Sequence, residues 1–218
     1  MPDRAALTTR PAYLARAARG LKAADPVMRR LIERLGPCRL ACSPQEVFPS
    51  LVASITYQQL NGKAAETIHG RVLARFDGGR TLTPRRFQKV GDAQLRAAGL
   101  SANKLLAMRD LADKCLSGVV PARAALERLP DGEVIEKLTQ VRGIGVWTAH
   151  MFLIFRLGRP DVLPVGDFAI RKAFGRHYRK SGALPPPEAV ERHGRAWAPW
   201  RTVASWYLWR SLDGDAAL

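Results

Sequence analysis

Apolar residues recur along most of the chain with the three- and four-residue spacing of an amphipathic helix. Two such stripes consist of Met28, Ile32 and Leu35, and of Ala65, Ile68, Val72 and Phe76. No segment alternates apolar and polar residues as a strand would, and the Asn61-Gly62 pair opens a helical pattern instead of a hairpin between strands. The pattern therefore predicts an all-α fold.

Capping residues mark the boundaries of several of these helices. We predict N-caps at Asp25, Ser43, Ser101 and Asp131. Ser43 has the spacing of a capping box with Glu46, and Gly36 ends the helix that Asp25 begins.

The charge is strongly unbalanced: 35 Lys and Arg against 19 Asp and Glu give a formal net charge of +16 in 218 residues. A basic, well-solvated surface is one explanation. Because the excess is carried by a globular composition instead of a disordered tail, a polyanionic partner is favoured, with nucleic acid ahead of an acidic membrane.

Neither a membrane-spanning run nor the apolar core of a signal peptide is present in the sequence, so a cytoplasmic protein is expected, associated with the nucleoid if bacterial. The cysteines, Cys38, Cys42 and Cys115, have no CxxC spacing and are expected to be buried thiols. The histidines have no metal-ligand spacing and are expected to be ordinary surface or hydrogen-bonded residues: His69, His150, His177 and His193.

A short turn, Val141 to Gly145, separates two helical patterns. Its two glycines, Gly143 and Gly145, permit a sharp reversal that presents backbone N–H groups to an outside phosphate. Ile144 can lock the two helices together, and Arg142 can add charge at the rim. A plain hairpin between helices explains the turn equally well when it is taken alone.

Further along, Gly166 and Asp167 precede an amphipathic helix that contains Ile170 and Phe174. Taken alone, Asp167 indicates an N-cap. The pair of segments "VRGIGVWTAH" and "LPVGDFAIRKAF" resembles the helix-hairpin-helix and the Gly/Pro-rich loop with its aspartate in the DNA glycosylase superfamily. The segments "ITYQQLNGKAAETI" and "WAPWRTVASWYLW" are similar to two further motifs of its 3-methyladenine DNA glycosylase II branch. The resemblance extends from about Phe48 to Leu212.

The resemblance implies a compact, all-helical fold with two lobes and an active-site cleft between them. We expect residues 1–47 to pack with the C-terminal lobe, residues 48–163 to form the lobe with the hairpin, and residues 164–218 to complete the second lobe. Asp167 would be the catalytic residue. Its carboxylate would stabilise the positive charge that develops on the deoxyribose and direct a water.

Trp147 stands where relatives that also cleave the strand carry a lysine, which attacks the sugar as an amine. An indole cannot form a Schiff base, so a monofunctional enzyme is expected. The branches of the superfamily with an iron–sulfur cluster carry a cysteine quartet that this chain lacks.

The resemblance also implies a pocket for a base extruded from the duplex. Its expected residues are Trp147, Trp209, Tyr57 and Met151, the last in place of a family tyrosine; for the aromatic residues a core role is the alternative. A wedge residue that fills the gap left in the duplex by the extruded nucleotide is expected at Gln59 or Leu60. A polar turn between helices would explain that segment too.

The residues expected to contact DNA are Arg142, Gly143, Ile144, Gly145, Gln59 and Leu60. The backbone carbonyls of Thr139, Val141 and Ile144 are candidate ligands of a monovalent cation, Na⁺ or K⁺, and no cofactor is expected to be required. The expected protein is a monomeric glycosylase that excises 3-methyladenine and 7-methylguanine from duplex DNA in base excision repair. The alternatives are a glycosylase for uracil, mismatched thymine or an oxidised purine, and a DNA-binding protein without catalysis.

Overall fold

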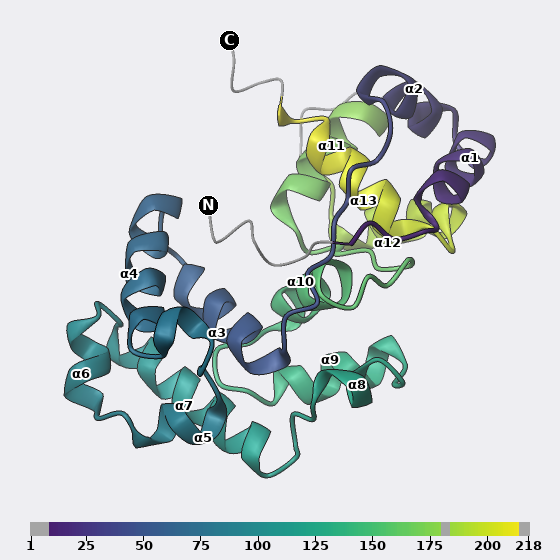
Figure 1. The fold of residues 1–218 in the computed structure, drawn as a ribbon. Helices are drawn as coiled ribbons and strands as arrows, with labels where there is room; N and C mark the ends of the chain where they lie inside the picture. The colour runs from purple at the N-terminus through teal and green to yellow at the C-terminus, as the bar shows by residue number, and fades with distance from the viewer. Residues whose placement is uncertain (1–8, 180–183, 214–218) are drawn as a thin grey trace. The chain divides into compact units, whose positions relative to one another are not determined.

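The computed structural model describes residues 9–179 and 184–213, which are organised in helices (Figure 1). Within these ranges the one extended pairing is an isolated bridge between Thr9 and Cys42. The predicted all-α class is therefore confirmed. No helix in the described part of the chain is long and apolar enough to cross a membrane.

The chain divides into two compact units. Among the described residues, unit 1 is Pro44–Ala149, and unit 2 joins residues 9–43 with residues 150–179 and 184–213. The division falls at Ala149, inside an apolar helix, instead of at the predicted Leu163. The second half of that helix belongs to unit 2 because its end bonds the N-terminal segment there: Ser43 N donates to Phe155 O at 3.0 Å.

Unit 1 is a bundle around the long helix α7, against which α3, α5 and α6 pack. Its core includes Leu51, Phe87 and Met108, which are fully buried. Its helices are α3 (Val47–Tyr57), α4 (Gly62–Ala74), the 3₁₀ turn η1 (Asp77–Gly79), α5 (Pro84–Lys89), α6 (Asp92–Ala97), α7 (Ala102–Leu116), α8 (Arg123–Leu126), α9 (Asp131–Thr139) and the first turn of α10 (Val146–Phe155).

In unit 2 the C-terminal helix α13 packs against α1, α2 and α11, so that the two ends of the chain share one core. Met28, Trp197 and Tyr207 are completely buried in it. Its helices are α1 (Leu14–Ala24), α2 (Pro26–Leu35), the rest of α10, α11 (Phe168–Tyr178), α12 (Pro187–Gly194), the 3₁₀ turn η2 (Arg195–Trp197) and α13 (Arg201–Arg210).

The predicted caps are right at Asp25 and Ser101, whose side chains accept hydrogen bonds from the first turns of α2 and α7. They are wrong at Ser43 and Asp131. The Ser43 N–H bonds the end of α10, and Glu46 precedes α3 without a side-chain cap. Pro130 occupies the N-cap position of α9, which leaves Asp131 in the first turn, where its charge still favours the helix dipole.

Asp25 does more than cap a helix. It is 3% exposed, and its Oδ1 accepts from the N–H groups of Val27 and Met28. Its Oδ2 accepts from Tyr178 Oη at 2.9 Å, His193 Nε2 at 3.0 Å and Trp197 Nε1 at 2.8 Å. Burial would raise the pKa of this carboxyl, but the hydrogen bonds outweigh it and hold the pKa below its ordinary value. The carboxylate therefore joins α2 to the C-terminal helices.

We expect Asp25→Ala to lower the free energy of unfolding at pH 7 by about 3 kcal/mol, because the buried Trp197 N–H and the part-buried Tyr178 and His193 donors lose their acceptor. A folded-state pKa below the unfolded one gives stability that is complete above the unfolded value and is lost as the pH falls through the folded value. The difference between the two proteins should therefore shrink below about pH 4.

Urea denaturation at pH 7 and pH 3 measures both effects. Asp77→Asn, at an exposed position, serves as the control and should change stability by less than about 0.5 kcal/mol. Equal stability of Asp25→Ala and the unmodified protein at pH 7 would contradict the assigned role.

Candidate functional site

The hairpin between α9 and α10 is a tight turn. Gly143 has φ 75°, and Ile144 N donates to Val141 O at 3.0 Å. The side chain of Ile144 is buried. Gly145 does not have a positive φ, and a Cβ there would meet no atom of the described residues within 4 Å, its two chain neighbours apart. The reversal thus depends on Gly143, whereas Gly145 leaves the outer face of the turn open.

The outer face of the hairpin presents hydrogen-bond donors and exposed apolar groups. Among the described residues, the N–H groups of Gly143 and Gly145 find no acceptor. Arg142 is exposed, and so are Val146 at 53% and Trp147 at 51%. Backbone donors at a helix N-terminus suit a phosphate, and exposed large apolar side chains are typical of a binding surface.

Asp110 of α7, a half-exposed residue of unit 1 that the sequence reasoning missed, bonds this hairpin. Its Oδ2 accepts from Arg142 N at 2.7 Å, and its Oδ1 pairs with Lys114 one turn away. Burial would raise the pKa of Asp110, but the Arg142 N–H and the Lys114 ammonium outweigh it and lower the pKa. The four-residue spacing to Lys114 is the one signal in the sequence that could have drawn attention to Asp110.

The turn between α3 and α4 lies beside the hairpin, since Gln58 Nε2 donates to Gly143 O at 2.9 Å. The structure thus brings together the two segments expected to contact DNA. Gln59 has φ 55°, and Leu60 is 38% exposed. Asn61 caps α4 by accepting from Ala64 N at 2.9 Å, as the Asn-Gly pattern indicated.

Tyr57 lies at the end of α3 with its ring edge-on to His69, at 5.9 Å between ring centres. Tyr57 Oη and His69 Nε2 are buried and find no partner among the described residues. Burial raises the pKa of Tyr57, with a further contribution from Glu66, and lowers the pKa of His69. His69 therefore differs from the expectation of an ordinary surface or hydrogen-bonded histidine, and Tyr57 as a pocket residue stays a prediction.

In unit 2 Asp167 begins α11. It is 9% exposed, and its Oδ1 accepts from Ile170 N at 2.9 Å and from Trp209 Nε1 at 3.1 Å. Trp209, half-buried on α13, stacks on Phe155 at 6.0 Å between ring centres. The carboxylate is thus oriented by two N–H donors from different helices, and Trp209 contacts a predicted catalytic residue through its ring edge.

Trp147 and Met151 are four residues apart on α10 and so lie on one side of that helix. Trp147 belongs to unit 1, whereas Met151, half-buried, belongs to unit 2 together with Asp167 and Trp209. The cleft expected between two lobes stays a prediction.

Two further tryptophans, to which the sequence assigned no role, differ in burial: Trp197 is completely buried in the core, and Trp206 is half-buried.

A cation site at the hairpin also stays a prediction. The carbonyl of Val141 already accepts from Ile144 N, which leaves it one lone pair for a metal ion. Thr139 closes α9, where helix carbonyls lack an intrahelical partner. Among the described residues no three His, Cys, Asp or Glu side chains cluster as metal ligands.

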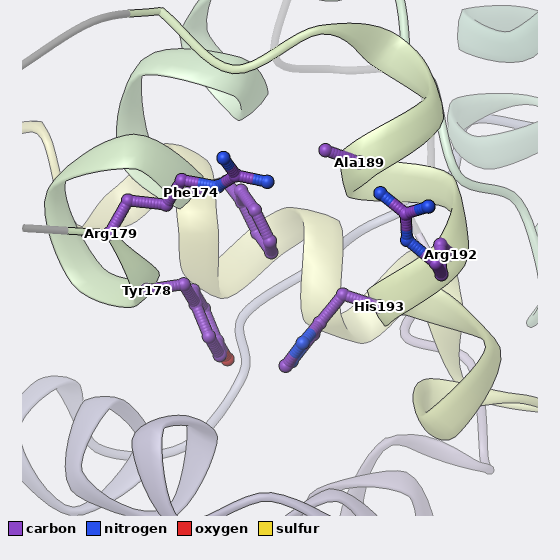
Figure 2. Close-up of a pocket in the computed structure, with 6 residues that line it drawn as sticks. All are labelled: Phe174, Tyr178, Arg179, Ala189, Arg192 and His193. Atoms are coloured by element: carbon purple, nitrogen blue, oxygen red, sulfur yellow. The ribbon is translucent and has the colours of Figure 1, made fainter. Parts of the chain in front are cut away.

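Unit 2 contains a pocket of about 290 Å³ (Figure 2). Figure 2 shows the rings of Tyr178 and His193 converging below it, where both bond Asp25. Its lining is Phe174, Tyr178, Arg179, Ala189, Arg192 and His193. No predicted site residue lines this pocket.

A family model described as the HhH-GPD superfamily of base excision DNA repair proteins matches residues 52–199. The chain belongs to this superfamily. The matched range begins in α3, contains the hairpin and Asp167, and ends just before α13.

Similar proteins are matched over most of their own length. DNA-3-methyladenine glycosylase 1 of Schizosaccharomyces pombe is 35% identical over 88% of this chain and 84% of its own. A crystal structure of a DNA-3-methyladenine glycosidase from Bacillus halodurans is 37% identical, with a TM-score of 0.84 over 97% of this chain and 94% of that one. The S. pombe protein Mag1, solved in complex with abasic DNA, has a TM-score of 0.80 at 34% identity, over 90% of this chain and 96% of that one.

Proposed function

We propose that the chain is a monofunctional DNA glycosylase that releases alkylated purines, such as 3-methyladenine and 7-methylguanine, from duplex DNA and leaves an abasic site. The observation that carries the proposal is the placement of Asp167, a nearly buried carboxylate oriented by Ile170 N and Trp209 Nε1. Its relatives named as 3-methyladenine glycosylases supply the substrate class.

One oriented carboxylate is sufficient for this chemistry. Cleavage of the base–sugar bond develops positive charge on the deoxyribose, which a carboxylate in a dry site stabilises while it directs a water. An alkylated purine leaves a cationic nucleotide as a neutral base, so the reaction needs little help from a general acid. The two N–H donors on Oδ1 fix the direction in which Asp167 presents its charge.

Recognition of DNA in this proposal begins with charge. The net charge of +16 attracts the phosphate backbone, and the N–H groups of Gly143 and Gly145, which have no acceptor among the described residues, bind it. The damaged base is extruded, Gln59 or Leu60 fills the gap, and the exposed indole of Trp147 attracts a cationic purine by cation–π interaction. The complex of Mag1 with abasic DNA supports a DNA partner.

The proposed enzyme acts as a monomer and requires no cofactor. A Na⁺ or K⁺ ion on the carbonyls of Thr139, Val141 and Ile144 would stiffen the hairpin without entering the chemistry. The cytoplasm, or the nucleoid in a bacterium, is the proposed location.

We expect Asp167→Asn to abolish base release while duplex binding is kept, because an amide of equal size loses the charge needed at the transition state. Duplexes with 3-methyladenine, 7-methylguanine, hypoxanthine or uracil are incubated with each protein, and free base is measured. Asp77→Asn, on the surface of unit 1, is the control for loss of one carboxylate. Full activity of Asp167→Asn would refute the assignment, and release of uracil alone would refute the substrate class.

Trp209→Phe should lower the single-turnover rate about tenfold with little change in duplex binding, because the ring remains but the N–H that orients Asp167 is lost. Trp206→Phe is the matched control on the same helix: its ring contacts Tyr207 and Arg210 and should tolerate the change. Equal rates for the two variants would show that the indole N–H does not position the carboxylate.

The products are expected to be free base and an intact strand with an abasic site, because Trp147 supplies no amine. Heat or alkali should be needed to break the strand, and borohydride should trap no covalent adduct between protein and DNA. An adduct that forms in proportion to base release would assign this chain to the bifunctional enzymes instead.

A further inference from the structure

The turn between α3 and α4 combines an unusual backbone with an exposed apolar side chain. Gln59 has φ 55°, a conformation that residues with a Cβ adopt rarely, and the next residue, Leu60, is 38% exposed. Such a backbone persists where the surrounding contacts determine it. The contacts that hold this turn therefore decide where Gln59 and Leu60 lie.

Lys104 of α7 supplies two of these contacts. Its Nζ donates to Thr56 O at 2.7 Å and to Gln58 O at 2.8 Å, on the residues just before Gln59. The last carbonyls of a helix have no intrahelical partner, so the ammonium satisfies groups that water would otherwise bind. Burial of this ammonium lowers the pKa of Lys104. Because α7 packs against α3, the Lys104 side chain reaches the end of α3 and holds its last carbonyls in place.

The same helix also holds the hairpin. Six residues beyond Lys104, Asp110 accepts from Arg142 N at 2.7 Å, and Gln58 Nε2 closes the set by donating to Gly143 O. All of these residues lie in unit 1. The turn and the hairpin are therefore tied both to α7 and to each other.

We propose that Lys104 is a positioning residue for base extrusion: its ammonium fixes the turn so that Gln59 and Leu60 enter the gap in the duplex at a set position relative to the phosphate bound by the hairpin. The proposal rests on the proposed glycosylase function. Lys104 acts through the backbone of the turn and does not itself touch the reacting atoms.

Lys104→Met keeps most of the side-chain volume and removes the donors. Single-turnover base release is measured for one lesion in a stable base pair and for the same lesion unpaired in a bulge, where extrusion costs least. We expect a loss of about tenfold on the paired substrate, the effect of a lost charge-assisted hydrogen bond, and of less than about twofold on the bulged one. Lys104→Arg, which retains a charged donor, should recover part of the loss.

Lys89→Met is the matched control, because Lys89 is exposed on α5 and its side chain makes no hydrogen bond or ion pair within the described residues. It removes one positive charge from the same unit and should leave the ratio of the two rates unchanged. Should Lys104→Met fail to fold, Gln58→Ala breaks the tie to Gly143 at a half-exposed position and should show the same selective loss.

Amide hydrogen exchange of residues 58–61 in the free protein provides a readout that does not depend on activity, and it should be faster in Lys104→Met. Equal losses on the paired and bulged substrates, or unchanged exchange of the turn, would overturn the role of Lys104. Absence of base release by the unmodified protein from both substrates would instead overturn the proposed function, and the exchange rates would still decide whether Lys104 holds the turn.

Discussion

The unpaired backbone groups at helix ends are the constraint on which this structure depends. A chain divided among many short helices must satisfy N–H groups at each start and carbonyls at each end without the help of a sheet. Asp25, Asn61, Ser101 and Asp167 do so at helix starts, and Lys104 does so at the end of α3. The proposed chemistry uses the same positions, because the catalytic carboxylate is also a cap and the phosphate donors are N–H groups next to the start of α10.

Asp25 and Asp167, two buried aspartates of unit 2, show how one residue type can have two different roles. Both cap a helix, and both also accept an indole N–H from a tryptophan far away in the chain. Asp25 accepts five hydrogen bonds from the described residues and is enclosed by aromatic rings, which makes it part of the core. Asp167 is oriented by two N–H donors on one oxygen, and the exposed Phe168 follows it directly. Asp25 is thus a structural carboxylate of the core, whereas Asp167, next to an exposed side chain, is the proposed catalytic one.

Sequence patterns correctly predicted the features that depend on residues close together in the chain. The helical stripes, the caps at Asp25 and Ser101, and the helix start at Asn61 follow from spacings of three and four residues, and all are present. The Ser43 cap was wrong because α3 begins only at Val47, with Glu46 at its N-cap position, and Ser43 N bonds the end of α10 instead. Lys104 bonds carbonyls 46 and 48 positions away, and Asp25 bonds a tryptophan 172 positions away. No periodicity encodes such pairings, so the roles of Lys104 and Asp110 were missed although the motifs of the site were recognised.

Gly145 faces open space within the described part of the chain, since a Cβ added there would touch none of its non-neighbouring atoms and its φ does not require glycine. Folding alone thus exerts no demand for glycine at this position, in contrast to Gly143 two residues earlier, where the backbone is left-handed. A glycine at this position leaves room for a partner's surface to come within a methyl group's width of the turn. In related sequences, substitutions at position 143 would therefore be limited by the backbone conformation of the turn. Substitutions at position 145 would be limited by the shape of the binding partner.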